Sequence, residues 1–311
     1  MILEFDAPLV ERAVLLHAGA REDFHADREG AFRIADPDQR GRAFAAVHDR
    51  WFRDLGLDRE VREALRELQV LEQGIARAFV WWVSRTPDEG AELFVQPDDG
   101  VSPPTQRRRL VIRLRAETLV EPARCRALLR RELLHVADMI DPDFGYQPTV
   151  PPSPAGPTED RLVAARYGAA WSATVVGRLV RRGRLPEDAC AEAADRFGRA
   201  YPMLGPAAEV AFERLRCDDH PTHLDLALLA ADPLAAAGVR PTTATGSRCS
   251  LCRMPAYAFC TTLDDVLAAR IIADFPRWHA SEPVCLQCGD LYRSTLPPTS
   301  TTLTDGLRGG A

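Results

Sequence analysis

The sequence predicts an α+β fold with additional helices, followed by a small C-terminal module that contains four paired cysteines. Short runs of β-branched and aromatic residues lie among helical segments in the first half of the chain. Helical patterns continue to about residue 239, and two Cys-x-x-Cys pairs follow. A chain of 311 residues, 46% hydrophobic and 27% charged, has ordinary globular composition and can build one large or two smaller domains.

The first predicted helix begins at Asp36-Pro37, where an aspartate cap precedes a proline in the first turn, and it ends near Gly56. A second helix is expected over residues 58–71. Apolar, aromatic and β-branched runs then predict three strands, over residues 75–83, 91–95 and 109–115. The last run alternates apolar with basic residues, so we expect a strand with one solvent-facing side at the edge of the sheet.

Helical spacing of apolar residues predicts the later elements, over residues 121–140, 159–182, 187–201, 205–217 and 223–231. A proline-rich stretch between the first two of these is expected to be a stiff linker or surface loop. The predicted organisation is therefore a domain, a linker, a helical region packed on that domain, a cysteine module and a flexible tail, over residues 1–147, 148–158, 159–239, 240–295 and 296–311.

Charge and apolar patterning favour a cytoplasmic protein without a membrane segment. The first residues, Met1 to Asp6, lack a basic region followed by a long apolar run, and no stretch of 18 apolar residues occurs. The net charge of −6 argues against a generally cationic surface for nucleic acid, although the cluster of residues 106–109 is a local exception. The cysteines outside the two pairs stand singly, as expected for buried thiols in a reducing compartment.

The strongest chemical signal is the two Cys-x-x-Cys pairs, formed by Cys249 with Cys252 and by Cys285 with Cys288. Each pair can form a knuckle whose sulfurs reach one ion at roughly 2.3 Å, and four thiolates leave no coordination position for a substrate. The spacing therefore predicts one structural Zn²⁺, with a redox pair or fortuitous spacing as alternatives. Gly289 follows the second pair, and we expect it to adopt the positive φ that such a turn requires.

The 32 residues between the pairs predict further elements of this module. Residues 256–259 can form a strand, residues 263–275 a helix, and Trp278 an apolar anchor. Cys260 is surplus to the four ligands. The module resembles the zinc-ribbon and treble-clef group, in which a bound metal replaces a core that a short segment cannot build.

The predicted helix after the third strand carries the run Arg131-Glu132-Leu-Leu-His135. This run resembles the His-Glu-x-x-His helix of zincin metallopeptidases, in which two histidines bind zinc and the glutamate activates its water. Residues 35–145, with helices, a small sheet and then the motif helix, are similar to a minimal zincin core. The resemblance implies Glu132 as general base and His135 as a zinc ligand.

Arg131 occupies the place of the first histidine of that motif, and a guanidinium cannot bind a metal. It can instead pair with Glu132 or with another carboxylate. Several side chains could supply a further ligand, namely Asp138, Asp141, Asp143, His220 and His223. A helix without a metal, in which His135 hydrogen-bonds within the core, is the alternative interpretation.

We therefore expect an intracellular zinc protein whose zincin-like domain has lost hydrolysis and which acts as a scaffold or interaction protein for a protein partner. The alternative is an active zinc metallopeptidase that uses Glu132 and His135. A further alternative is nucleic-acid binding through the cysteine module and residues 107–109.

Overall fold

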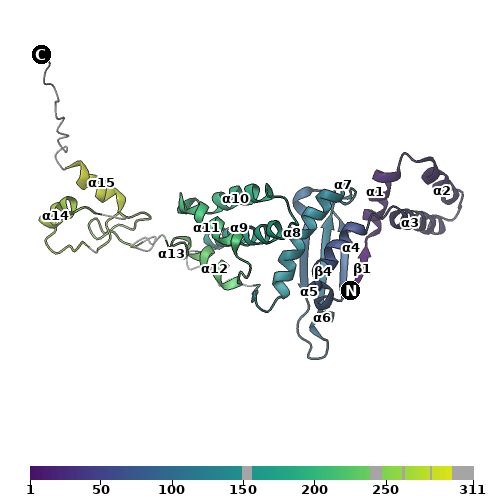
Figure 1. Ribbon diagram of the computed structural model, residues 1–311, viewed down its shortest axis with the longest axis horizontal. Coiled ribbons are helices and arrows are strands. Elements are labelled where there is room, and N and C mark those ends of the chain that lie inside the picture. Colours follow the sequence, from purple (N-terminus) through teal and green to yellow (C-terminus); the bar gives the residue numbers. More distant parts are fainter. Residues whose placement is uncertain (149–155, 239–246, 261–262, 281, 296–311) are drawn as a thin grey trace, which may run out of the picture. The chain divides into compact units, whose positions relative to one another are not determined.

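The computed structural model describes residues 1–148, 156–238, 247–260, 263–280 and 282–295 (Figure 1). The chain divides into two compact units, Met1–Pro233 and Leu234–Ala311, and each is described by itself below. Most of the predicted proline-rich linker and the whole predicted tail lie outside the described residues.

The sheet of the first unit has four strands in the order β1-β2-β4-β3. Their bounds are Ile2–Phe5 for β1, Arg77–Trp82 for β2, Gly90–Val95 for β3 and Arg108–Leu114 for β4. Strands β1, β2 and β4 are parallel, and β3 is antiparallel to β4. The three predicted strands are confirmed, whereas β1 was missed because four residues are too few to show an alternation.

The prediction that residues 109–115 lie at the sheet edge is wrong. Strand β4 is hydrogen-bonded on both sides, by β2 and by β3, and the edges are β1 and β3. The alternation of apolar and basic residues in β4 reflects the two faces of the sheet and does not indicate an edge strand. Even on the more open face, Val111 is only 5% exposed.

One face of the sheet is buried and the other is largely open. The inward side chains of the central strands are at most 1% exposed, namely Ala78, Val80, Leu110, Ile112 and Leu114. The side chains that alternate with them are exposed or half-buried, apart from Val111. This asymmetry is typical of an α+β sheet that packs helices on one side only.

Helices α1, α2 and α3 span Ala7–Ala18, Glu22–Phe32 and Pro37–Asp54. Only α3 was predicted, and its expected cap is confirmed because an Asp36 carboxylate oxygen accepts the Gln39 backbone N–H at 2.7 Å. Asp6 caps α1 in the same way with one carboxylate oxygen. Its other oxygen accepts the Trp82 backbone N–H at 3.0 Å. Asp6 thereby fixes the start of α1 against the end of β2.

The helices that precede and follow the remaining strands are shorter, except for the motif helix. Helices α4 and α5, over Arg59–Arg66 and Gln69–Gly74, replace the single helix predicted over residues 58–71. The other elements of this part are η1, α6, α7 and α8, over Thr86–Asp88, Pro104–Arg107, Ala116–Leu119 and Pro122–Ile140. Helix α8 confirms the predicted helix over residues 121–140.

A helical layer completes the first unit. Its helices α9, α10, α11 and α12 span Pro157–Arg181, Ala189–Ala200, Ala207–Cys217 and His223–Ala231, and η2 spans Pro202–Leu204. They confirm the four predicted helices within a few residues. Helix α9 is central and packs against α8, α10, α11 and α12. It approaches α11 very closely at Gly177, where an added Cβ would lie 2.1 Å from the Arg216 carbonyl oxygen.

The second unit contains helices α14 and α15, over Asp265–Asp274 and Leu286–Ser294, and α13 over Pro233–Ala236 lies at the boundary. Helix α14 confirms the helix predicted over residues 263–275. The strand predicted over residues 256–259 is wrong, because only one isolated bridge, from Phe259 to Cys285, forms there. The predicted anchor Trp278 is confirmed at 7% exposed, in a small core with Cys260, Leu267, Ile271 and Val284.

A buried ion pair joins α8 to α9. The Arg178 guanidinium donates to the two Asp138 carboxylate oxygens at 2.8 and 2.6 Å, and Trp171 Nε1 donates to the same carboxylate at 2.7 Å. Both charged side chains are at most 7% exposed. Removing one partner of such a pair leaves a buried charge without compensation.

We predict that Asp138→Asn lowers the free energy of unfolding by about 3–5 kcal/mol, because it leaves the buried Arg178 charge without a counter-charge. Chemical denaturation followed by circular dichroism measures this change. The matched control is Asp219→Asn, which removes the partner of Arg181 at a site where the carboxylate is 61% exposed. The control is expected to cost less than about 1 kcal/mol, and equal losses in both variants would refute the prediction.

Candidate metal centre

The four predicted cysteine ligands come together in the second unit. One sulfur from each of Cys249, Cys252, Cys285 and Cys288 lies within 4.8 Å of the other three. The Cys252 and Cys285 sulfurs are 4.0 Å apart, close to the separation of about 3.8 Å that a tetrahedron with Zn–S bonds of 2.3 Å requires. The donor set therefore fits one metal ion held by four sulfurs.

The first pair lies in a tight knuckle. The Arg253 backbone N–H donates to the Cys249 carbonyl at 2.9 Å, and the Cys249 N–H donates to the Met254 carbonyl at the same distance. An isolated bridge between Arg248 and Pro255 closes the turn. Arg253 has a φ of 62°, and no other non-glycine residue in the described part of the chain has a positive φ. The turn thus imposes on Arg253 a backbone conformation that glycine adopts at less cost.

The second pair lies at the start of α15. Cys285 is the N-cap residue of this helix, and its sulfur accepts the Cys288 backbone N–H at 3.4 Å. The Cys285 N–H in turn donates to the Cys249 sulfur at 3.3 Å, which connects the two pairs. Backbone N–H groups and the helix N-terminus favour the thiolate form that binds metals.

Gly289 does not have the predicted role. It lies within α15 and has no positive φ. Its missing side chain makes room for Cys260, whose sulfur would lie 2.3 Å from a Cβ at position 289. The fifth cysteine of the module is therefore packed behind the helix that carries Cys288, and it is 8% exposed.

The cysteines of the cluster differ in how readily they form thiolates. Burial by itself raises the pKa of Cys249, but backbone N–H groups of Cys285, Cys252 and Leu251 lower it to about 6. Burial raises the pKa of Cys285 and of Cys288, and interaction with Cys249 raises both further. One thiolate forms readily, whereas several adjacent thiolates require a positive ion to balance their charge.

Glu132 and His135, predicted from the motif helix, line one small cavity of about 160 Å³ between α8, α9 and α10. The His135 Nδ1–H donates to the Arg131 carbonyl at 2.9 Å, which leaves Nε2 with its lone pair. The edge of the His135 ring contacts Trp171, with 4.9 Å between ring centroids. Burial lowers the pKa of His135 and so favours the neutral ring.

Arg131 lines the same cavity and lies 3.9 Å from the Glu192 carboxylate of α10. Arg196 approaches this carboxylate as well, at 3.5 Å. Sequence reasoning missed Glu192, because nothing in the motif indicates a partner sixty residues later. Arg131 therefore pairs with another carboxylate, as one of the sequence-based interpretations allowed.

Two of the side chains considered as further ligands are engaged elsewhere. Asp138 binds Arg178 and Trp171, and His223 Nδ1 is hydrogen-bonded to the Tyr167 hydroxyl at 2.8 Å. Within the described ranges, only the four cysteines form a group of three or more His, Cys, Asp or Glu side chains in ligand geometry. The motif helix consequently offers Glu132 and His135 without a third protein ligand there.

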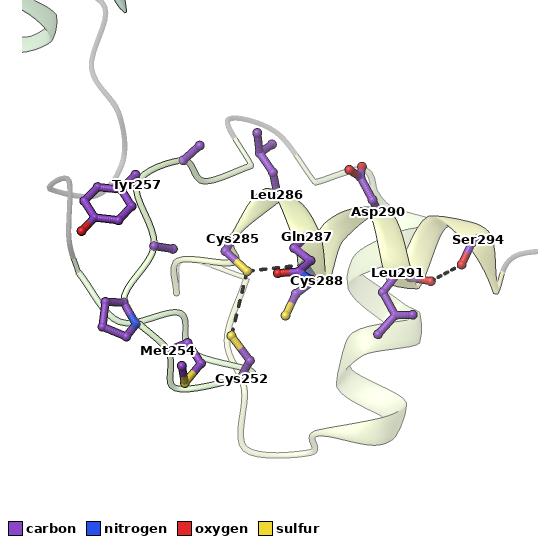
Figure 2. Close-up of a pocket in the computed structure, with 13 residues that line it drawn as sticks. Cys252, Met254, Tyr257, Cys285, Leu286, Gln287, Cys288, Asp290, Leu291 and Ser294 are labelled. Carbon is purple, nitrogen blue, oxygen red and sulfur yellow. Dashed lines mark hydrogen bonds between the residues drawn. The ribbon is translucent and has the colours of Figure 1, made fainter.

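A groove of about 810 Å³ runs beside the cysteine cluster (Figure 2). One wall is the face of α15 that carries Gln287, Asp290, Leu291 and Ser294, and the other is the segment over residues 254–258. Large apolar side chains stand exposed along it, with Met254 63%, Tyr257 82%, Leu286 45% and Leu291 62% exposed. Three of the four cysteines, Cys252, Cys285 and Cys288, thus line an open and largely apolar groove.

Comparisons with known proteins give no relative for this chain: no family model, no curated protein and no solved structure matches it. Among the helices in the described part of the chain, none combines the length and apolarity needed to cross a bilayer.

We predict that Arg253→Gly raises the thermal stability of the zinc-loaded second unit by about 0.5–1 kcal/mol, because glycine relieves the strain of the positive φ. Arg253→Val should act in the opposite direction. Calorimetry of the zinc-loaded full chain measures both. The control is Met254→Gly, an exposed neighbour in the same knuckle, for which only a loss is expected. A loss with Arg253→Gly would contradict the prediction.

Proposed function

We propose that this chain is a zinc-binding interaction protein whose four-cysteine centre is structural and whose first unit is a zincin-like domain without hydrolytic activity. The observation that carries the proposal is the closed set of four sulfurs, Cys249, Cys252, Cys285 and Cys288, within 4.8 Å of one another. Four protein thiolates fill a tetrahedral shell, so a metal held there supports folding and not catalysis.

The chemistry of the donors favours zinc as the ion. Thiolates are soft ligands, and a tetrahedral set of four selects zinc or an iron–sulfur cluster. A knuckle supplies the first pair and a helix N-terminus supplies the second. This combination supports a treble-clef-like module over a simple ribbon. The core beside it has only five buried residues, so metal binding supplies much of its folding free energy.

The groove beside the centre supports a protein as the partner. Four large apolar side chains are exposed there, whereas folded monomers rarely expose contiguous apolar patches without a function. Among the described residues that line the groove, Asp290 is the only charged one, and Arg293 Nη1 donates to its carboxylate at 2.7 Å. An apolar side chain of a protein segment matches this lining better than a charged ligand does.

The loss of hydrolysis is proposed from the cavity on α8. Arg131 stands where the zincin motif has its first histidine, and it pairs with Glu192. A guanidinium at this place repels a metal cation, and no third ligand among the described residues joins Glu132 and His135. We therefore assign these two residues no catalytic role.

An active metallopeptidase is the second candidate, and one observation favours it. Glu132 and His135 line the same cavity, and the hydrogen bond of His135 Nδ1 leaves Nε2 available for a metal. In this case Glu132 would act as the general base and a second zinc would be bound.

We predict that the purified full chain contains one zinc and that Cys285→Ser contains none, because an incomplete thiolate shell loses the ion. The second unit of this variant should unfold, while the first unit keeps its thermal transition. Metal analysis and calorimetry measure both effects. Cys260→Ala is the control, since it removes the fifth cysteine of the module and should leave one zinc bound. Unchanged metal content in Cys285→Ser would refute the structural centre.

We also predict that Arg131→His binds a second zinc when the metal is saturating, because it places two imidazoles four residues apart on one helix face. Arg130→His, one position away, is the matched control and should bind only one. Isothermal titration with zinc gives the stoichiometries. Two zincs in the unmodified chain would favour the peptidase, and one in Arg131→His would remove the support for the zincin comparison.

A further inference from the structure

The open face of the sheet carries aromatic and basic side chains in register. Along β2 this face presents Arg77, Phe79 and Trp81, because side chains two residues apart point to the same side. On β4 their neighbours across the strands are Arg109, Val111 and Arg113. The rows continue onto the two edge strands. On β1, Ile2 and Glu4 lie beside Arg77 and Phe79. On β3, Phe94 and Glu92 lie beside Arg109 and Val111.

The aromatic side chains of this face are available to a ligand. Trp81 is 47% and Phe94 49% exposed, and Phe79 is half-buried. The rings of Phe79 and Trp81 lie 6.4 Å apart between centroids. Phe94 lies in the row of Arg109 and Arg77, about 10 Å across the sheet from β2, and it is displaced along the strands by two residues from Phe79 and by four from Trp81. Exposed rings at this spacing on a rigid sheet form a surface on which planar groups can stack.

The charges of this face are arranged around an unpaired arginine. Arg113 forms a two-pronged ion pair with Glu92, and Arg77 lies 3.9 Å from Glu4. Arg109 has no carboxylate partner among the described residues. It lies directly opposite Arg77 on the neighbouring strand, and like charges in that position cost stability. An anion held between Arg77 and Arg109 would remove this cost.

The balance of charge on this face differs from that of the whole chain. Three arginines and two glutamates give the face a net charge of +1, whereas the chain carries −6. A wholly apolar protein surface would bury Arg109 beside Arg77 without compensation, which is costly. A ligand whose planar apolar groups are joined by anionic groups can stack on the aromatic side chains and pair with the arginines.

We propose that the open face of the sheet binds single-stranded nucleic acid. Bases stack on Trp81, Phe79 and Phe94, and backbone phosphates bind Arg109 and Arg77. Stacking of this kind tolerates any base, so the expected binding has little sequence preference. The site lies in the first unit and is independent of the zinc centre and of the function proposed for it.

The test is fluorescence anisotropy of labelled dT15 and rU15 with the zinc-loaded full chain, over a range of salt concentrations. Trp81→Ala and Phe94→Ala should each weaken binding about fivefold or more, because each removes a stacking ring. Arg109→Ala should reduce the slope of log affinity against log salt by about 0.7, the value for one phosphate on a single strand. These side chains are exposed, so circular dichroism should show unchanged folding.

Two variants provide matched controls. Tyr257→Ala removes an exposed aromatic ring of the second unit, and Arg33→Ala removes an arginine of α2 whose side chain is 80% exposed. Both should leave the affinity unchanged. The proposal is overturned if neither oligonucleotide binds at low salt, or if Tyr257→Ala weakens binding as much as Trp81→Ala does. It is also overturned if the chain instead forms a dimer that Trp81→Ala dissociates, since the face is then a protein interface.

Discussion

Four sulfur atoms that lie within 4.8 Å of one another bring together two separate segments of the second unit. They come from two segments separated by 32 residues, and a buried core of only five residues lies beside them. Several neighbouring thiolates repel one another, so the arrangement is stable when a cation balances them. The knuckle at Arg253 and the start of α15 both serve this geometry, and the groove lined by Tyr257 and Leu291 depends on it in turn.

The first unit is built on different principles. Its sheet buries one face, and the pair of Asp138 with Arg178 connects α8 to the helical layer. The same helix α8 carries Glu132 and His135, which therefore stand in a fixed position beside Trp171 and α10. The same cavity contains Arg131 and Arg196, which lie 3.9 and 3.5 Å from the Glu192 carboxylate.

Local patterns in the sequence predicted most of the helices and strands but few of the contacts between them. Apolar spacing indicated α8 and the later helices, and the cysteine spacing indicated the sulfur cluster. Strand β1 was too short to detect, and the basic residues of β4 indicated an edge although they mark a face. Gly289 was assigned to a turn, whereas its role depends on the contact with Cys260. The position of Glu192 and the row from Arg77 to Phe94 depend on the register and packing of distant segments. A local sequence pattern does not carry this information.

The four sulfurs of the centre are not equally sheltered. Cys249 and Cys285 are buried and Cys288 is half-buried, but Cys252 is exposed. A chelator or an electrophile arriving from solution would therefore reach Cys252 first, and a metal held by the centre would at that moment keep its other three sulfur ligands. Loss of such a metal would then begin in the knuckle, at the Cys252 sulfur.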